Sequence, residues 1–241
     1  MHRWPPVSAP DLTIPADLTI EACEVTVGLP NYSETSVDIT SELVTFGVSV
    51  IEDCDFTVTY IDSEEGSCPV TITRSFTAID ECLNETTLTQ TIIIDDTTPP
   101  DLTIPADLTI EACEVTTGLP DYSETPVDIT GNEAAFGVTV TEDCNYTVSY
   151  VDSQTGTCPV VITRTFTAID ECLNEATLTQ IITIDDTTPP EVTAPANLTI
   201  EACDATTGLP DYSETSVDIT GNEAAFGVTV TEDCNYTVSY V

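Results

Sequence analysis

The chain has 241 residues and a formal net charge of −40, because 43 acidic residues stand against three arginines and no lysine. So few positive charges exclude proteins that bind nucleic-acid phosphates or anionic membrane surfaces. A hydrophobic content of 41% excludes a purely solvated acidic tail. The only histidine, His2, lies outside the repeats described below, which excludes histidine-based zinc sites and Ser-His-Asp triads within them. No apolar run approaches the roughly 18 residues of a membrane span, so we expect no membrane insertion.

The dominant feature of the sequence is an internal repeat with a period of 90 residues. The segment PDLTIPADLTI begins at Pro10 and recurs at Pro100, and the related PEVTAPANLTI begins at Pro190. This period is too long for a solenoid turn and fits one small domain per repeat. We therefore expect a non-repeat leader at 1–9, repeat 1 at 10–99, repeat 2 at 100–189 and a truncated repeat 3 at 190–241.

Repeat 2 serves as the template for the predicted elements, and its β-branched residues predict strands rather than helices. In chain order we expect strands over 101–112, 126–130, 135–141, 144–152, 160–170 and 176–184. The fifth strand alternates, with one face made of Val160, Ile162, Phe166 and Ala168. The sixth is predicted to point three side chains inward: Leu178, Ile182 and Ile184. Six or seven short strands separated by turn residues predict an all-β fold of tandem immunoglobulin-like β-sandwich domains.

The segment IDDTTPPD joins repeats 1 and 2 at 94–101, and the closely similar IDDTTPPE joins repeats 2 and 3 at 184–191. Two adjacent prolines fix the backbone in an extended form. We therefore expect short, stiff, Pro-rich linkers, which favour a rod over a floppy chain.

The end of each repeat has a recognisable pattern. The run ITRTFTAIDECLNEATLTQIITIDDTTPP, at 162–190, resembles the closing half of hyalin-repeat (HYR-like) and bacterial Ig-like modules, and PADLTIEAC resembles their opening strand. With four cysteines per unit, the chain is similar to the tandem repeats of large cell-surface adhesins of Bacteroidota. The resemblance implies a secreted, non-catalytic stalk module. One departure is that Leu83 and Leu173 stand where those modules usually have glycine.

Each full repeat contains four cysteines, at spacings of 31, 14 and 14 residues. A structural zinc site needs cysteines paired two to four residues apart, so these spacings argue against zinc. An even number of cysteines in a small β-unit predicts disulfides and an oxidising compartment.

The expected strand directions predict which cysteines share one end of a repeat. They place Cys113 with Cys158 at one end of repeat 2 and Cys144 with Cys172 at the other. Because a disulfide needs Cα atoms within about 7 Å, we predict pairing inside each repeat: Cys113–Cys158, Cys144–Cys172, Cys23–Cys68 and Cys54–Cys82. The alternative for repeat 2 is the hairpin pair Cys144–Cys158. Under the preferred pairing, Cys203 and Cys234 are free thiols.

Acidic residues from the linker and two loops are expected to meet at one end of repeat 2. They are Asp95, Asp96, Asp101, Glu142, Asp143, Asp170 and Glu171. Oxygen ligands from several segments suit Ca²⁺, which takes about six to eight of them, so these residues are a candidate calcium site. The alternative is that the carboxylates cap turns and keep the protein soluble. No segment has the EF-hand pattern.

Two further features carry weaker predictions. By strand alternation, Arg74 and Arg164 point to the core side together with Phe76 and Phe166, so we expect each to pack its stem at the sandwich rim and pair its head with a carboxylate. The Asp-Thr-Thr of each linker resembles the O-glycosylation acceptor pattern of Bacteroidota, which implies glycosylation of Thr97 and Thr187.

Two functions fit these features. The first is a structural stalk at the cell surface or outside the cell, whose partners are the neighbouring repeats of the same chain. The second is that each repeat binds a surface glycan or protein and gains avidity from repetition, through aromatic residues such as Tyr122, Tyr146 and Tyr150. With 43 carboxylates, no pair is singled out by spacing as catalytic, so we expect no enzyme activity.

Overall fold

The structure is a computed structural model, and it describes residues 8–29, 31–119, 121–201 and 213–241. The chain divides into two compact units. Unit 1 comprises residues up to 103 together with 128–149 and 167–178, and unit 2 comprises 104–127, 150–166 and residues from 179 onward. Repeat 2 thus contributes to both units, so the boundaries of the units differ from those of the sequence repeats.

Nearly all regular structure is β-strand, as the sequence predicts. In repeat 1 the elements are β1 (Asp11–Thr13), β2 (Leu18–Glu21), α1 (Val25–Gly28), β3 (Val37–Asp38), β4 (Ser49–Ile51), β5 (Phe56–Glu65), β6 (Val70–Asp80) and β7 (Glu85–Asp95). In repeat 2 they are β8 (Asp101–Thr103), β9 (Leu108–Glu111), α2 (Val115–Gly118), β10 (Val127–Asp128), η1 (Glu133–Phe136), β11 (Thr139–Thr141), β12 (Tyr146–Thr155), β13 (Val160–Asp170) and β14 (Glu175–Asp185). The described part of repeat 3 has β15 (Glu191–Thr193), β16 (Val217–Asp218), η2 (Glu223–Phe226), β17 (Thr229–Thr231) and β18 (Ser239–Tyr240).

Two predicted strands are shorter than expected. The strand predicted over 101–112 is two strands, β8 and β9, with Pro105 in the gap between them; proline has no N–H to donate and interrupts a ladder. The strand predicted over 135–141 begins with the 3-10 turn η1, which Gly137 ends in a left-handed conformation at φ 68°. Only its last three residues form β11.

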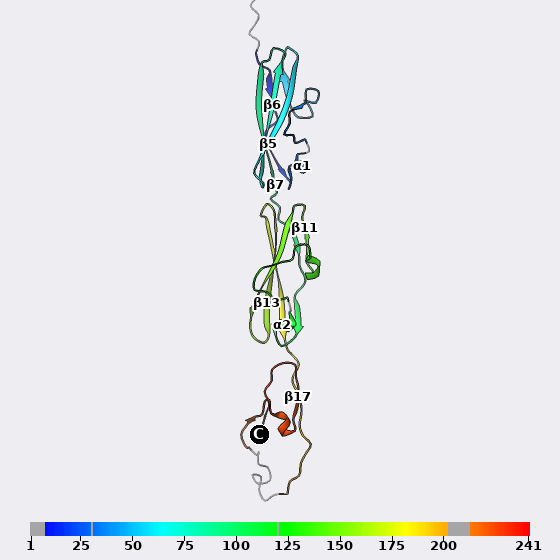
Figure 1. The fold of residues 1–241 in the computed structure, drawn as a ribbon, viewed down its shortest axis with the longest axis vertical. Helices are drawn as coiled ribbons and strands as arrows, with labels where there is room; N and C mark the ends of the chain where they lie inside the picture. The colour runs from blue at the N-terminus through cyan, green and yellow to red at the C-terminus, as the bar shows by residue number, and fades with distance from the viewer. Residues whose placement is uncertain (1–7, 30, 120, 202–212) are drawn as a thin grey trace, which may run out of the picture. The chain divides into compact units, whose positions relative to one another are not determined.

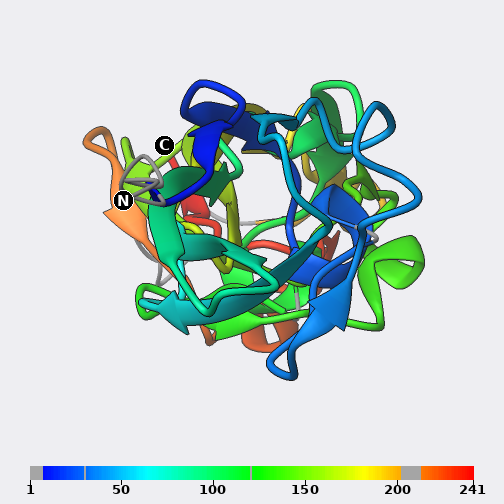
Figure 2. The ribbon, with the colours of Figure 1, turned by 90° about the horizontal axis from the view of Figure 1, so that it is seen from above.

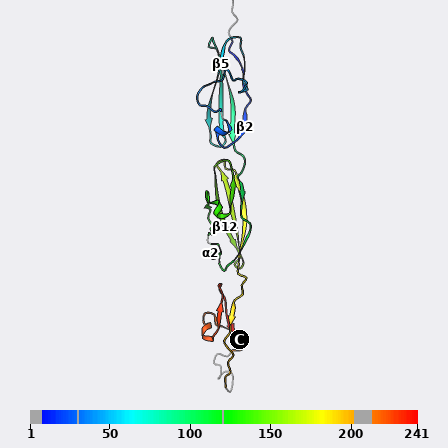
Figure 3. The same cartoon turned by 90° about the vertical axis from the view of Figure 1, so that its right-hand side faces the viewer.

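The sheet of repeat 1 has the strand order β2-β7-β6-β5-β3. Strands β5, β6 and β7 form two consecutive antiparallel hairpins (Figure 1; Figure 2 gives the view from above). Strand β2, which is labelled in Figure 3, pairs in parallel with β7. In this pairing Leu18 lies opposite Ile92. Strand β1 instead pairs antiparallel with β4 in a separate two-stranded sheet. The start of the repeat therefore belongs to one sheet before Pro15 and to the other sheet after it.

The two sheets of repeat 1 pack through one apolar core. This cluster contains Leu12 of β1, Val58 and Tyr60 of β5, and Phe76 and Ala78 of β6. Its members are at most 5% exposed, and burying each large apolar side chain stabilises the fold by about 1.5–3 kcal/mol. Residues from both sheets in one buried cluster define a two-layer β arrangement.

Repeat 2 repeats this topology, with the sheet order β10-β12-β13-β14-β9 and the two-stranded pair β11-β8. The predicted inward face of β13 is confirmed, because Val160, Ile162, Phe166 and Ala168 are all buried. In β14, Ile182 and Ile184 are buried as predicted, but Leu178 is 42% exposed. Gln180 fills the next inward position instead, where its side-chain amide donates to the Ala106 carbonyl at 2.7 Å.

A buried ion pair lies in the core of repeats 1 and 2. The Arg74 side chain donates to both oxygens of Asp62, from Nε at 2.7 Å and Nη2 at 2.8 Å, and its guanidinium lies 4.4 Å from the Tyr60 ring centre. In repeat 2, Arg164 pairs with Asp152 in the same way and lies over Tyr150. The predicted carboxylate partner is confirmed, but the arginines are buried in the core rather than placed at its rim.

Candidate functional site

The cysteines at the β7 end of repeat 1 are positioned by the sheet itself. Strands β2 and β7 run in parallel and end together, so Cys23, two residues after β2, lies beside the end of β7; the Ala22 N–H donates to the Asp95 carbonyl at 3.0 Å. Cys68 lies in the turn before β6, the antiparallel neighbour of β7, with its Sγ 3.7 Å from Asp95 Oδ1. Cys23 and Cys68 therefore share one end of repeat 1.

The other two cysteines of a repeat share its opposite end. In repeat 2, Cys144 lies just before β12 and Cys172 just after β13, and these strands are neighbours in the sheet. The Glu171 N–H donates to the Asn145 carbonyl at 2.9 Å, which ties the two loops together. The prediction that Cys144 and Cys172 share an end is confirmed by their common neighbour, because the sulfur of each lies within a cluster around Asp96.

The disulfides join consecutive repeats. Within unit 1, Cys23 bonds to Cys144 and Cys68 bonds to Cys172, each with Cα atoms 5.3 Å apart. Within unit 2, Cys113 bonds to Cys234, with Cα atoms 5.2 Å apart. We call the two bonds between repeats 1 and 2 the first connection, and the Cys113–Cys234 bond between repeats 2 and 3 the second connection.

This pattern corrects the predicted pairing. None of the predicted bonds Cys113–Cys158, Cys144–Cys172, Cys23–Cys68 and Cys54–Cys82 is present, and neither is the alternative Cys144–Cys158. The predicted sharing of ends agrees with the structure for Cys144 and Cys172, but their bonds run to the preceding repeat rather than to each other. A cysteine at the end of one repeat has a nearer partner in the next repeat. Cys234, predicted free, is bonded, and Cys203 lies outside the described residues.

Three cysteines are free among the described residues: Cys54, Cys82 and Cys158. Cys54 is half-buried, whereas Cys82 and Cys158 are exposed. Burial raises the pKa of the Cys54 thiol, and the negative charges of Glu81 and Glu52 raise it further. A raised pKa lowers the thiolate fraction, so Cys54 is a slow nucleophile at neutral pH.

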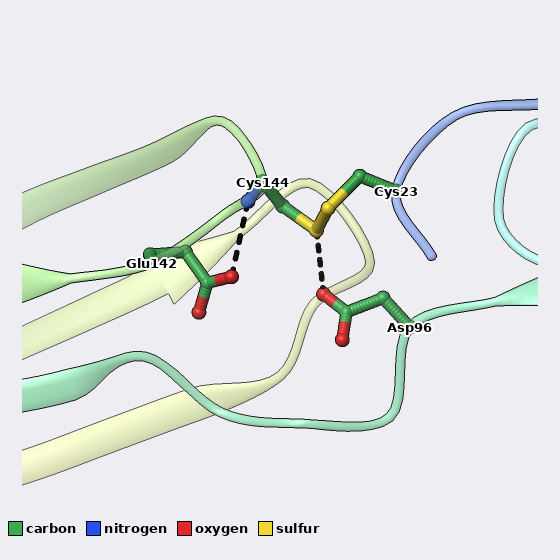
Figure 4. Close-up of side chains that lie close together, drawn as sticks. All are labelled: Cys23, Asp96, Glu142 and Cys144. Atoms are coloured by element: carbon green, nitrogen blue, oxygen red, sulfur yellow. Dashed lines mark hydrogen bonds between the residues drawn. A yellow bond between two sulfur atoms is a disulfide. The ribbon is translucent and has the colours of Figure 1, made fainter. Parts of the chain in front are cut away.

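Asp96 lies against the Cys23–Cys144 disulfide (Figure 4). Its Oδ2 is 2.7 Å from Cys144 Sγ, and Asp96 and Cys144 are 6% and 5% exposed. A disulfide sulfur carries no hydrogen, so a hydrogen bond at this contact requires a protonated carboxyl as the donor. Burial raises the pKa of Asp96, the Thr98 N–H opposes this at 3.0 Å, and the charges of Asp170 and Glu142 add to the rise.

Four of the seven predicted calcium ligands gather around the first connection. Oxygens of Asp96 and Glu142 lie within 4.8 Å of each other and of both sulfurs of the Cys23–Cys144 disulfide. By the same distance, an oxygen of Asp170 lies close to Asp96 and to the sulfur of Cys172. An oxygen of Asp95 lies close to the sulfurs of Cys68 and Cys172. The other three predicted ligands do not join these groups: Asp101 pairs with Thr141 in the β8–β11 ladder, and Asp143 and Glu171 line a neighbouring hollow.

The hydrogen bonds of these carboxylates bear on the calcium prediction. Glu142 Oε1 accepts the N–H groups of Asp143 and Cys144, at 2.8 and 3.0 Å. Asp170 accepts the backbone N–H of Asn174 at one oxygen and its side-chain amide at the other, both at 2.9 Å. These oxygens are therefore satisfied by the protein itself, and the disulfide sulfurs are not thiolate ligands. The donor set falls short of the six oxygens that calcium takes, and calcium binding stays a prediction.

The linker threonines are held by a glutamate at the end of the second strand of each repeat. Thr97 donates its backbone N–H to Glu21 Oε1 at 2.6 Å, and its hydroxyl lies 3.1 Å from Glu21 Oε2. Thr187 makes the same contacts with Glu111, at 2.7 and 3.0 Å. These bonds lower the pKa of Glu21 and Glu111. Glycosylation of Thr97 and Thr187 stays a prediction.

The second connection differs in its acidic surroundings. Asp186, the counterpart of Asp96, is only half-buried, and it lines a hollow with Glu111, Glu232 and the Cys113–Cys234 bond. Glu232 Oε1 accepts the backbone N–H groups of Asp233 and Cys234, at 2.9 and 3.1 Å. The turn that presents the bonded cysteine is therefore built in the same way at both connections.

Among the residues that the structure describes, no helix is long and apolar enough to cross a bilayer. No protein-family model matches the chain, and no curated protein matches its sequence. The geometry of the cysteines and their neighbours is therefore the basis for the functional proposals that follow.

Proposed function

We propose that the chain is a segment of a non-catalytic structural stalk in a secreted or cell-surface repetitive adhesin. The observation that carries this proposal is that every disulfide among the described residues joins one repeat to the next. A disulfide that closes a repeat on itself stabilises that repeat alone. A disulfide between repeats also passes tension directly from one repeat to its neighbour, which is what a stalk requires.

The fold and linkers support the same proposal. We take each full repeat to be an immunoglobulin-like sandwich, because two sheets share one core and the first strand divides between them. We take the Pro-rich segments to be stiff linkers, and in the first of them Thr97 and Thr98 are bound by Glu21. These bonds limit the freedom of the linker beyond what Pro99 and Pro100 impose.

The chemistry of the chain supports a position outside the cell. Disulfides persist in oxidising compartments and are rare in the cytosol. A net charge of −40 keeps a long repetitive protein soluble and repels its copies from one another. The partners in this proposal are the neighbouring repeats of the same chain.

The second function, in which each repeat binds a glycan or protein, has less support. Of its three candidate aromatic residues, Tyr150 is 3% exposed, and its hydroxyl donates to the Asp121 carbonyl at 2.6 Å. Tyr122 donates to Glu124 at 2.7 Å. Tyr150 is therefore a core residue, Tyr122 is committed to a local carboxylate, and Tyr146, which is half-buried, is left as the candidate for ligand contact.

Force spectroscopy of the full chain, attached through its two ends, tests the stalk. Cys23 and Cys144 are 121 residues apart in sequence. While their disulfide is intact, the chain between them cannot be stretched, which shortens the fully extended protein by roughly 400 Å at about 3.3–3.6 Å per residue. We expect a short maximal extension in the oxidised chain and a much longer one after reduction. A variant with every cysteine replaced by serine is the matched control and should resemble the reduced chain in both buffers.

Equal extension of oxidised and reduced chains would contradict the stalk proposal, because load would then not pass through the disulfides. The alternative has its own test, which is binding of the oxidised full chain to an array of surface glycans. Specific binding there, lost on substitution of Tyr122 or Tyr146, would favour the binding module.

A further inference from the structure

The inter-repeat disulfides follow one rule. The four cysteines of a repeat can be called first to fourth in chain order, so that Cys23, Cys54, Cys68 and Cys82 define the positions. Cys23–Cys144 joins a first cysteine to the second cysteine of the next repeat, and Cys113–Cys234 does the same one repeat later. Cys68–Cys172 joins a third cysteine to the fourth cysteine of the next repeat. First and third cysteines thus bond forward along the chain, and second and fourth cysteines bond backward.

The three free cysteines occupy the positions that this rule leaves open. Cys54 and Cys82 are the second and fourth cysteines of repeat 1, whose bonds would run to a preceding repeat. Cys158 is the third cysteine of repeat 2, whose bond would run to the fourth cysteine of the next repeat, 90 residues after Cys172 and beyond residue 241. Every free thiol among the described residues therefore occupies a position that the rule would pair with a cysteine of another repeat.

The loops that carry Cys54 and Cys82 already have the geometry of their bonded counterparts. The Cys54 N–H donates to Glu52 Oε1 at 3.3 Å, as the Cys144 N–H donates to Glu142 at 3.0 Å. The Glu81 N–H donates to the Asp55 carbonyl at 3.1 Å, which ties the two loops together as Glu171 and Asn145 do in repeat 2. The Asn84 N–H donates to Asp80 Oδ1 at 2.8 Å, as the Asn174 N–H donates to Asp170 Oδ1 at 2.9 Å. This end of repeat 1 is preorganised although its thiols are unbonded.

Cys158 is preorganised in the same sense. Its Sγ lies 3.8 Å from Asp185 Oδ1, and the Sγ of its bonded counterpart Cys68 lies 3.7 Å from Asp95 Oδ1. Cys158 also lines a hollow with Cys113, Cys234 and Asn235, beside the bond that joins repeats 2 and 3. The free thiol is thus held at the end of repeat 2 that already bonds to the next repeat.

We propose that Cys54 and Cys82 form a two-thiol acceptor site for one further copy of this repeat, placed before residue 10, whose first and third cysteines bond to them. Each bond forms when two thiols lose two protons and two electrons to a disulfide oxidant, such as oxidised glutathione, which is itself reduced to two thiols. Cys158 is the corresponding donor for a following repeat. This inference deepens the proposed function, because it makes the connections a ladder that extends by the same two bonds at each step.

The full chain provides the baseline for the test. After oxidation in a glutathione buffer, alkylation followed by peptide mass spectrometry should label Cys54, Cys82 and Cys158 and leave the six bonded cysteines unlabelled. The test itself uses an extended chain in which a second copy of residues 10–99 replaces residues 1–9. In this chain Pro99 of the added copy meets Pro10 as it meets Pro100 in the natural sequence.

In the extended chain we expect alkylation of Cys54 and Cys82 to be lost. Cys54 should appear in a disulfide peptide with the added copy of Cys23, and Cys82 in one with the added copy of Cys68. Two matched variants separate the bonds: serine at the added copy of Cys23 should restore labelling of Cys54 alone, and serine at the added copy of Cys68 should restore labelling of Cys82 alone. Residues 152–189 added after Val241 should likewise protect Cys158.

Persistent labelling of Cys54 and Cys82 in the extended chain would overturn the inference, and so would a Cys54–Cys82 bond within repeat 1. These outcomes are independent of the stalk proposal, which the force measurement tests on the natural chain. Bonds that form as expected in a chain that does not carry load would leave the ladder intact and refute the stalk.

Discussion

Repeats 1 and 2 contain cysteines at the same four positions and bond the first in both, but they differ in which of the other three are bonded. In repeat 1 the first and third cysteines are bonded, whereas the second and fourth, Cys54 and Cys82, are free. In repeat 2 the second and fourth are bonded to repeat 1, the first is bonded to repeat 3, and only Cys158 is free. The local loops are alike, so the state of each cysteine is set by its neighbouring repeat rather than by its own.

The buried ion pairs show a second difference between the matched repeats. Arg74 has one carboxylate partner, Asp62, and its Nη2 also donates a hydrogen bond to the Asn31 backbone carbonyl at 3.0 Å. Arg164 has two carboxylate partners, Asp152 and Asp121, at 2.8 and 3.0 Å. Residues 31 and 121 are matched positions, so one substitution between the repeats decides whether the buried arginine has a spare anion. The core of repeat 2 should therefore tolerate damage to its ion pair better than that of repeat 1.

Asp62→Asn should have the largest effect of the changes considered for the cores and connections. The side chains of Arg74 and Asp62 are 6% and 0% exposed, and breaking a buried pair typically costs about 3–5 kcal/mol because a charge remains uncompensated. Asp152→Asn should cost less, because Arg164 retains Asp121. Urea unfolding of the oxidised full chain, monitored separately for each repeat by hydrogen exchange, measures both values.

Asn31→Asp is the control that isolates the second carboxylate. Added to Asp62→Asn, it should recover part of the lost stability, because it gives Arg74 the partner that Arg164 already has. Equal costs for Asp62→Asn and Asp152→Asn, with no recovery, would show that Asp121 contributes nothing to the buried charge.

The connections should differ when a bond is removed from each. Cys113→Ser with Cys234→Ser removes the one disulfide that the described residues place in the second connection, whereas Cys23→Ser with Cys144→Ser leaves Cys68–Cys172 in place. A disulfide of this span typically contributes about 2–4 kcal/mol. We expect the full loss in the first variant, seen as faster amide exchange over β16 and β17, and a smaller loss in the second. Equal losses would mean that the two bonds of the first connection act independently.

Much of the fold follows from the sequence, since alternation along 160–170 identifies the long central strand and its buried face. The failures have local causes. Pro105 divides the first predicted strand into two. Leu178 is exposed, whereas Gln180, two residues later, is buried because its side-chain amide donates to a backbone carbonyl. Periodicity reports which face is apolar, but it does not report where a polar side chain finds a partner inside.

The disulfide pairing could not be predicted in the same way. The positions of the four cysteines in each repeat are compatible with disulfides within a repeat and with disulfides between repeats. Because every repeat has the same spacing, the spacing does not distinguish the two pairings. Strand direction predicts which cysteines lie at the same end of a repeat. It does not predict that one end of a repeat bonds to the opposite end of the next repeat. The acidic residues illustrate the same limit: Asp96 and Glu142 were expected to meet, whereas the disulfide beside them was not.

Leu83 and Leu173 offer a smaller test. Both have left-handed backbone conformations, at φ 65° and 68°, and both side chains are more than 80% exposed. A left-handed backbone costs a residue with a Cβ about 1–2 kcal/mol, and glycine avoids this cost. Glycine in turn loses more backbone entropy on folding, which offsets about 0.5–1 kcal/mol of the gain. Leu83→Gly should therefore raise the free energy of unfolding of repeat 1 by at most about 1.5 kcal/mol. Leu173→Gly should do the same for repeat 2, and a loss in either case would show that the leucine side chain makes a stabilising contact.

The smallest change concerns the charge of Asp96. Burial raises its pKa in the folded state, so the folded protein binds this proton more tightly than the unfolded chain does. The resulting stabilisation is fully present below the unfolded pKa of about 3.9 and is lost as pH rises through the folded value. Asp96→Asn keeps the acceptor for Thr98 and cannot ionise. The variant should therefore melt at a higher temperature than the natural chain at pH 7, and this advantage should vanish at pH 3.5.

Asp186→Asn is the matched control, because Asp186 accepts the same backbone bond from Thr188 at 3.0 Å but is only half-buried. It should leave the melting temperature nearly unchanged at both pH values. Repeating the melts in EDTA and in millimolar Ca²⁺ tests the predicted metal site with the same proteins. A bound cation would stabilise ionised Asp96, so calcium would raise the melting temperature of the natural chain and of the Asp186 variant but not of the Asp96 variant. A gain for Asp96→Asn at pH 7 that calcium does not alter would show that the buried carboxyl is a cost of the first connection rather than a ligand.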